Sequence, residues 1–229
     1  MGKHSNQPHP AGTGRTRRPR GSLSREGILD AAEAVAAQGF DALTMRAVAS
    51  RLGAVPMALY NHFATKEQLV DALLDRVLSR FEPEPATDDW AEDLRRFARA
   101  HRRLLVQHPW AVAPLFNQPN PGLDAVRIGE FALGILRRAG FTNTQAVAAF
   151  SGIIALNYGW SSFTTARDLD PDSPGHDVGA MLAALPPTEY PLTVDVADEM
   201  GAYGSDHHYD FVLDQLLDGL RGTADAAPR

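Results

Sequence analysis

The chain contains no cysteine, which excludes disulfide scaffolds, thiol catalysis and cysteine-ligated zinc. It also lacks a long apolar stretch, because Ser151, Asn157, Ser161 and Ser162 interrupt its longest apolar run, residues 146–163. Alternating strand patterns, internal repeats and glycine-rich phosphate loops are absent from the sequence as well. We therefore expect an all-α, cytoplasmic protein that has no cofactor and no membrane partner.

Positive charge is scarce except at one end of the chain. The 229 residues carry 22 Lys and Arg against 28 Asp and Glu, a formal net charge of −6. Residues 1–25 hold six of the basic residues and no acid. Residues 1–22 are rich in Pro, Gly, Ser and Arg and lack the apolar stretch of a secretory signal, so they are predicted to form a basic, disordered arm.

The segment TMRAVASRLGAVPMALYNHF, residues 44–63, has the pattern of two short helices joined at a glycine. Thr44 is a typical N-cap, and Gly53 can adopt the left-handed conformation that a tight turn requires. In the second helix Leu59 and Phe63 are four residues apart and so face inward. The pattern predicts a helix-turn-helix, in which the first helix crosses the DNA backbone and the second lies in the major groove.

Helices on both sides of this pair complete a small unit. One closes at Gly39, and the other, residues 65–81, begins with the capping box Thr65-x-x-Gln68 and leads into the rest of the chain. The predicted domains are the arm at 1–22, a helix-turn-helix DNA-binding domain at 23–70 that is a three-helix bundle, and a larger helical regulatory and dimerisation domain at 71–229.

Local charge favours a nucleic-acid partner although the whole chain is acidic. No Asp or Glu lies within residues 42–66, so Arg46 and Lys66 are free to meet phosphates. Small and apolar side chains on the outer face can contact thymine methyl groups, while Asn61 can bond base edges and Tyr60 a phosphate. The candidate DNA-contacting residues are Thr44, Arg46, Val55, Pro56, Met57, Ala58, Tyr60, Asn61, His62 and Lys66.

The larger domain is predicted to be helical, with one long loop. Apolar periodicity ended by proline or glycine indicates helices at residues 88–108, 122–140, 144–165 and 209–222. Repeated prolines indicate a flexible loop near 169–205, with one short helix near 178–184.

Aromatic and polar side chains of the larger domain form a candidate effector-binding set, because ligand pockets combine apolar surface with a few polar groups. The candidates are His101, His108, Trp110, Phe116, Asn117, Asn157, Trp160 and Phe163. Asp206, His207 and His208 are of metal-ligating types, but adjacent histidines at a helix start rarely converge on one ion. We therefore expect a solvated helix start there and no metal site.

Dimerisation is predicted from the helix at 144–165, which is apolar on nearly every face and needs more cover than one domain of this size provides. The helix at 209–220 can supply part of that cover, and two such helices from each subunit would form a four-helix bundle. The candidate interface residues are Phe150, Ile154, Tyr158, Phe211, Leu213 and Leu217.

Residues 23–70 resemble the DNA-binding domain of the TetR family of transcriptional repressors. The resemblance rests on the run LTMRAVASRLGAVPMALYNHFATKEQL, with its Leu-Tyr pair, the aromatic residue three positions later and the Lys after the cap. The larger domain is more loosely similar to the tetracycline-repressor branch, through HPW at 108–110 and FVLDQLLDGLRG at 211–222.

This resemblance implies a homodimer whose two heads sit on adjacent major grooves of a palindromic double-stranded DNA operator. It implies that Arg46 can reach a guanine and that a small molecule entering the larger domain releases the DNA. It also implies that His108 lies near the position at which that branch uses a histidine to help hold a metal-chelated drug. Because the surrounding segment departs from the tetracycline repressors, we expect another substantial apolar or aromatic effector. The arm could follow the minor groove or adjacent phosphates.

Two other functions fit parts of the sequence. An architectural DNA-binding protein would need no effector, and an all-α enzyme could use His101, His108 or the Asp206 cluster as acid-base groups. No nucleophile elbow, paired carboxylates or cofactor loop supports catalysis, so we expect no enzyme. The sequence leaves open whether the regulator represses or activates, and repression follows only from the resemblance.

Overall fold

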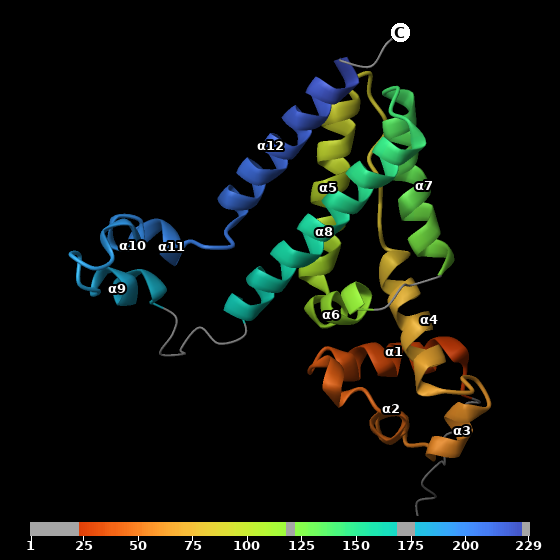
Figure 1. The fold of residues 1–229 in the computed structure, drawn as a ribbon. Helices are drawn as coiled ribbons and strands as arrows, with labels where there is room; N and C mark the ends of the chain where they lie inside the picture. The colour runs from red at the N-terminus through yellow and green to blue at the C-terminus, as the bar shows by residue number, and fades with distance from the viewer. Residues whose placement is uncertain (1–22, 118–121, 169–176, 226–229) are drawn as a thin grey trace, which may run out of the picture.

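The computed structural model describes residues 23–117, 122–168 and 177–225, so the predicted arm at 1–22 lies outside the described residues. Within these ranges every regular element is a helix, which confirms the all-α prediction. A small head formed by α1 to α3 lies at one end, and α4 runs from it into a larger helical body (Figure 1). None of the described helices combines the length and apolar character needed to cross a lipid bilayer.

The head contains α1 (Arg25–Ala36), a short 3-10 turn (Phe40–Ala42), α2 (Met45–Leu52) and α3 (Pro56–Tyr60). The hydroxyl of Thr44 accepts a hydrogen bond from the backbone N–H of Ala47 at 3.1 Å, which confirms the predicted N-cap of α2. Gly53 has φ 64° and ψ 29°, the left-handed conformation expected at the turn between α2 and α3. The helix-turn-helix geometry is therefore present.

The helix α4 (Lys66–Leu78) joins the head to the body. Thr65 caps it by accepting from the N–H of Gln68 at 3.2 Å, but the Gln68 side chain accepts from Ala64 at 2.9 Å rather than from Thr65 as a strict capping box requires. Buried leucines and valines along α4 belong to one apolar cluster that continues from the head into the body. A movement of α4 would therefore disturb packing at both ends.

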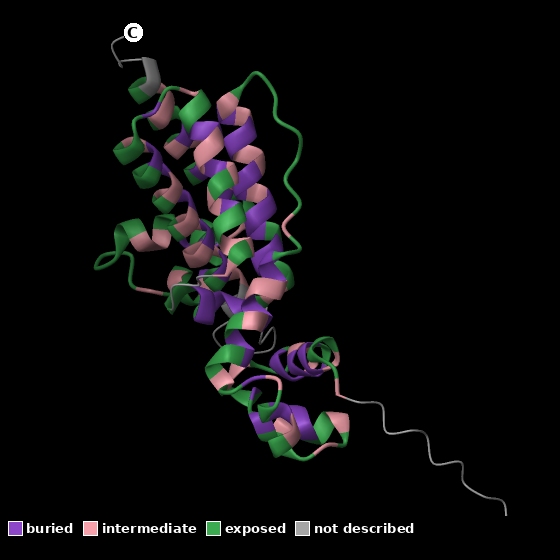
Figure 2. Cartoon of the chain, turned by 90° about the vertical axis from the view of Figure 1, so that its right-hand side faces the viewer, coloured by how far each residue is buried: buried purple, intermediate pink, exposed green. Residues whose placement is uncertain are grey.

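The body consists of α5 (Trp90–Gln107), α6 (Pro109–Asn117), α7 (Leu123–Arg138), α8 (Asn143–Asp168) and α12 (Asp206–Asp225). Helix α5 packs against α6, α7, α8 and α12, so it occupies the centre of the body. The purple, buried surfaces of the helices accordingly face the interior (Figure 2). Sequence patterns did not predict α6, because Pro109 and Pro114 are typical helix breakers, whereas Pro109 here starts the helix.

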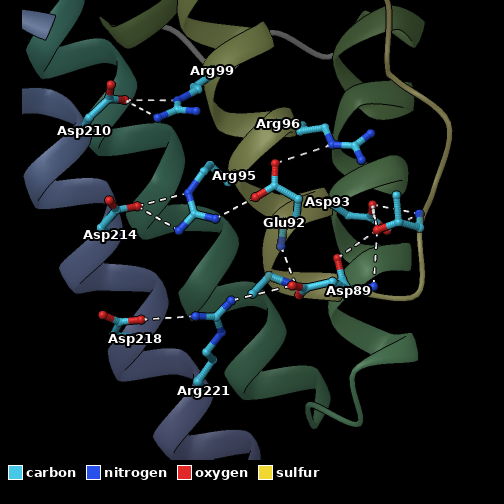
Figure 3. A network of polar contacts seen from close by, with 12 residues as sticks. Asp89, Glu92, Asp93, Arg95, Arg96, Arg99, Asp210, Asp214, Asp218 and Arg221 are labelled. Atoms are coloured by element: carbon cyan, nitrogen blue, oxygen red, sulfur yellow. Dashed lines mark hydrogen bonds and ion pairs between the residues drawn. The ribbon is translucent and has the colours of Figure 1, made fainter.

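Ion pairs fasten α12 to α5 along one side of the body (Figure 3). Figure 3 shows two of these pairs, Arg95–Asp214 at 2.8 Å and Arg99–Asp210 at 3.0 Å. A third pair, Arg102–Asp206 at 2.7 Å, joins the same two helices. One carboxylate oxygen of Asp206 is thus engaged by a guanidinium group of α5. No group of three or more His, Asp or Glu side chains in the described ranges is arranged to hold a metal ion.

The same helix corrects part of the dimer prediction. Leu213 and Leu217 are fully buried within the single chain, because α12 turns this apolar stripe toward α5 and α8. They therefore belong to the core and cannot face a second subunit. Phe211, by contrast, is 62% exposed on the outer side of α12.

The predicted loop near 169–205 is also corrected. Its described part contains three short helices, α9 (Val178–Ala183), α10 (Pro191–Asp195) and α11 (Ala197–Gly201), where the sequence predicted only the first. Pro191 was interpreted as a loop residue, but proline is tolerated in a first turn and here begins α10. These helices form a small group beside the main bundle (Figure 1).

Candidate DNA-reading surface and effector cavity

The outer face of α3 presents large apolar side chains to solvent. Val55 is 66% exposed, Met57 70% and Tyr60 42%, whereas Leu59 and Phe63 on the inner face are fully buried. Apolar side chains this exposed gain little from folding, and several of them on one short helix are typical of an interaction site. The head therefore offers a surface that its own chain leaves uncovered.

The remaining predicted DNA-contacting residues surround this surface. Thr44, Arg46, Pro56 and Asn61 are exposed, and Ala58, His62 and Lys66 are partly exposed. All ten candidates are thus accessible to some degree on the helix-turn-helix or at the start of α4. We define these ten residues as the DNA-reading surface.

Positive charge on this surface is not neutralised by the head. Among the described residues no carboxylate forms an ion pair with Arg46, Arg51 or Lys66. The Lys66 ammonium lies 5.8 Å from the centre of the Phe40 ring, a contact that leaves its charge available. These cations remain free to meet an anionic polymer.

Arg25 has a role that the sequence did not reveal. Its guanidinium lies 4.2 Å from the centre of the Phe63 ring and donates a hydrogen bond to the His62 carbonyl at 3.2 Å. The first turn of α1 thereby holds the end of α3 in place. Only the tertiary structure brings these positions together, since Arg25 and His62 are 37 positions apart in the sequence.

A cavity of about 720 Å³ lies in the body, within the size range of small-molecule sites. Residues of α4, α5, α6, α7 and α8 form its wall. The lining residues are Leu78, His101, Leu115, Phe116, Asn117, Ala125, Val126, Ile128, Gly129, Glu130, Leu133, Phe150, Ile154 and Tyr158. The wall is mostly apolar with four polar side chains, so it suits a largely apolar compound that carries a few polar groups.

The structure brings three of the eight predicted effector residues to this cavity, namely His101, Phe116 and Asn117. The other five, His108, Trp110, Asn157, Trp160 and Phe163, lie outside its lining. Conversely, Phe150, Ile154 and Tyr158, which were predicted at a dimer interface, line the cavity. Because α8 is apolar on nearly every face, its sequence could not show which face is turned toward the cavity.

Two segments of the chain match the descriptions of known protein families. Residues 28–73 match the description "Bacterial regulatory proteins, tetR family", and residues 82–224 match "Tetracyclin repressor-like, C-terminal domain". The chain belongs to the TetR family. It is therefore a DNA-binding transcriptional regulator, as the resemblance implied, and neither the architectural nor the enzymatic alternative is favoured.

Individual similar proteins support the assignment of this chain to the TetR family. The "HTH-type transcriptional repressor DrrR1" of Streptomyces coeruleorubidus is 30% identical over 91% of this chain and 82% of its own. An "HTH-type transcriptional regulator" of Saccharopolyspora erythraea is 35% identical over 59% of this chain and 58% of its own. The Streptomyces coelicolor TetR-family protein ActR, solved in complex with actinorhodin, superposes with a TM-score of 0.78 at 25% identity, covering 88% of this chain and 98% of ActR.

In this TetR-family regulator, His108 lies where the head meets the body. Its Nδ1 lies 2.9 Å from the Leu104 carbonyl oxygen, and its Nε2 lies 2.5 Å from a guanidinium nitrogen of Arg80. The same guanidinium donates to both carboxylate oxygens of Glu33 on α1, at 2.5 and 2.7 Å, and these hydrogen bonds lower the pKa of Glu33. His108 therefore belongs to a junction cluster with Glu33 and Arg80 that ties the head to the body.

Two polar groups of the cavity wall are uncharged at neutral pH. Burial lowers the pKa of His101 to about 4 and raises the pKa of Tyr158 to about 12. The His101 ring stacks on Phe97, with ring centres 6.2 Å apart and an angle of 12° between the planes. The wall thus offers neutral hydrogen-bonding groups within an apolar environment.

The neutral state of His101 predicts that the protein loses stability on acidification. The pKa falls from its ordinary value of 6.5 to about 4 on folding, so between these values the unfolded chain binds a proton that the folded chain does not. Stability is therefore full above pH 6.5 and declines as the pH falls toward 4. From pH 7 to pH 5 we expect His101 to cost about 2 kcal/mol of unfolding free energy, measured by urea unfolding.

The matched variant for this measurement is His101→Phe, which keeps the stacked ring and removes the titrating group. Other groups titrate equally in both proteins, so the difference between the two pH profiles isolates His101. Parallel profiles would contradict the prediction.

Proposed function

We propose that this TetR-family protein represses transcription by binding a palindromic operator as a homodimer, and that a small, largely apolar effector entering the cavity releases the DNA. The observation that carries this proposal is the position of Leu78, which lines the cavity and is the last residue of α4. The same helix begins at Lys66, on the DNA-reading surface. One helix thus contacts both sites.

The names of the similar proteins support repression and effector binding. DrrR1 is described as a repressor, and ActR has been solved with actinorhodin, so one similar protein is a repressor and another binds a small molecule. The cavity of this chain is large enough for an effector of several fused rings.

A mechanical route for the release runs through α7 and α4. The first turn of α7 is joined to α4 by a hydrogen bond from the Asp124 N–H to the Asp75 carboxylate at 2.9 Å. Ala125, Val126 and the residues that follow on α7 line the cavity. An effector that displaces α7 or α6 would shift the end of α4, and a shift of α4 changes the separation of two heads in a dimer.

The DNA-reading surface would act through two kinds of contact. Val55, Met57 and Ala58 would contact base edges and thymine methyl groups in the major groove, with Asn61 as a hydrogen-bonding group. Arg46 would reach a base, while Tyr60 and Lys66 would fix the register of the head through phosphates. These roles follow from accessibility, charge and the family geometry.

The proposed dimer interface uses the outer faces of α8 and α12. Small exposed residues recur along α8 at Ala148, Ser151 and Ala155, which allows a second helix to approach closely. On α12, Phe211 and Val212 are exposed apolar residues that such a contact would bury. Two copies of this pair of helices would form the four-helix bundle expected from the sequence.

Replacing Ala155 with arginine should convert the dimer to monomers. The change places a charge at the centre of the proposed contact, and an unpaired buried charge costs several kcal/mol. Sedimentation velocity at micromolar concentration measures the result, with Ala113→Arg as control because Ala113 is exposed on α6, away from this face. A dimeric Ala155→Arg variant would refute this interface.

The experiment that tests the proposed function as a whole is a thermal-shift screen of fused-ring aromatic compounds, followed by fluorescence anisotropy of bound operator DNA. A compound that raises the Tm and releases the DNA supports the proposal. Operator binding without any bound compound across a broad screen would favour the architectural alternative.

A further inference from the structure

Behind the cavity wall, a chain of hydrogen bonds joins α12, α8 and α5. The Tyr209 hydroxyl donates to Oδ1 of Asn157 at 2.7 Å, and Nδ2 of Asn157 lies 3.0 Å from the Ala98 carbonyl oxygen and 3.1 Å from Nδ1 of His101. The side chains of Tyr209, Asn157 and His101 are at most 2% exposed. Because buried polar groups are costly when unpaired, this chain fixes the orientation of each member.

The direction of the hydrogen bonds follows from the groups at the ends. The Ala98 carbonyl can only accept, so the amide nitrogen of Asn157 must face α5 and its oxygen must face Tyr209. The second hydrogen of that nitrogen then points at Nδ1 of His101, which must accept it. In a neutral imidazole the nitrogen that does not accept carries the proton, so His101 carries its proton on Nε2.

The Nε2–H group of His101 has no partner within the described part of the chain. His101 lines the cavity, while its Nδ1 is turned to Asn157 and one ring face is covered by Phe97. Of the two ring nitrogens, Nε2 is therefore the one left to face the cavity, beside Tyr158, whose ring lies at 82° to that of His101 with ring centres 5.8 Å apart. A donor in a mostly apolar wall is best satisfied by an acceptor on the compound that fills the cavity.

We propose that His101 selects effectors through a hydrogen bond from Nε2–H to an acceptor oxygen, such as a ring carbonyl, set in a flat apolar frame. Asn157 and Tyr209 are positioning residues, since they act only by fixing the tautomer and orientation of His101. The proposal rests on the effector role of the cavity proposed above. It names the chemical class that the cavity prefers, an aromatic ketone or quinone-type compound over the corresponding hydrocarbon.

The test compares two probes that differ in one group. Xanthone carries a ring carbonyl, and xanthene has the same three-ring frame with a methylene at that position. Isothermal titration or competitive fluorescence with the full chain should show xanthone binding about 5- to 10-fold tighter, the range of one net hydrogen bond. In His101→Phe, which keeps the stacked ring without the donor, the ratio should fall to about one.

Positioning by Asn157 is tested with a readout that a purely structural role would not move. Long-range proton–nitrogen NMR of the free protein should show the His101 ring protonated on Nε2, and Tyr209→Phe, which retains the ring and removes the donor to Asn157, should weaken that preference. A proton on Nδ1 in the wild-type protein would overturn the proposal whether or not any probe binds.

The binding outcomes separate this proposal from the proposed function. Equal binding of both probes by the wild type, unchanged in His101→Phe, would overturn the selection by His101 and leave the cavity as an effector site. Failure of both probes to bind the wild type would contradict the effector role of the cavity and the selection together.

Discussion

Replacing Tyr60 and Lys66 together with alanine is expected to lower operator affinity by about 10³-fold without unfolding the head. Each side chain is assigned one phosphate contact, and a dimer would lose four such contacts worth about 1 kcal/mol each. Tyr60 is 42% exposed and Lys66 makes only a long contact with the Phe40 ring, so little stability depends on them. Fluorescence anisotropy with operator DNA at fixed salt measures the loss, and circular dichroism checks the fold.

A matched control removes the same kinds of groups from the body. Tyr190 is 47% exposed and the Arg127 side chain 73% exposed, so Tyr190→Ala with Arg127→Ala deletes a hydroxyl and a cation that lie outside the head. This control should bind operator like the wild type. Loss of Lys66 from both heads should also reduce the slope of affinity against salt by about two. Equal affinity of the test and control variants would mean that this face of the head does not meet DNA.

Filling the cavity is expected to give a protein that binds operator but no longer responds to effector. Gly129 lies on α7 in the cavity wall, and a Cβ built there would meet the Phe150 ring at an ordinary 3.7 Å. A tryptophan at this position can therefore grow into the cavity. Its indole would compete with the effector for space. Accommodating both in the cavity would overpack it, which costs about 1–3 kcal/mol. Gly129→Trp should therefore raise the effector concentration needed for release roughly 10- to 100-fold.

The control for this substitution is Gly134→Trp. Gly134 lies on the same helix but outside the cavity lining, and no atom lies within 4 Å of a Cβ built there. Both variants gain the same helix propensity when glycine is replaced within α7. Release of operator by xanthone, followed by anisotropy, should require more compound only for Gly129→Trp. A Gly129→Trp protein that is released like the wild type would show that the effector acts elsewhere.

The head could be predicted almost completely from the sequence. Its signals are local: Thr44 caps the helix that it precedes, Gly53 takes the left-handed turn, and Leu59 and Phe63 lie four residues apart on the buried face. Each of these features depends on neighbours within one or two turns. Local spacing therefore contained the information that decides this part of the fold.

The body was predicted less well because its features depend on contacts between distant segments. The apolar residues of α8 occur on nearly every face, so Phe150 and Ile154 could not be assigned to the cavity rather than to a dimer interface. His108 was predicted beside the effector, but its ring is turned to Arg80 and Glu33 at the junction cluster. Neither the side of α8 that faces the cavity nor the contact of His108 with Arg80 produces a periodic pattern in the sequence.

The buried chain from Tyr209 to His101 illustrates the same limit. Asn157 was predicted to contact the effector, whereas it is fully buried one layer behind His101 and orients that residue instead. A polar residue in an apolar helix indicates a specific partner but does not name it. Asn157 and Tyr209 are 52 positions apart in the sequence, and only folding brings them into contact.

The measurement that tests the central claim most directly is genome-wide capture of DNA bound by the full chain in its source organism, carried out in parallel with the Tyr60→Ala, Lys66→Ala variant. A ligand-responsive repressor of this family predicts a small number of palindromic sites, enriched by the wild type and lost with the variant. Diffuse, salt-sensitive recovery of DNA that is the same for both proteins would contradict that claim.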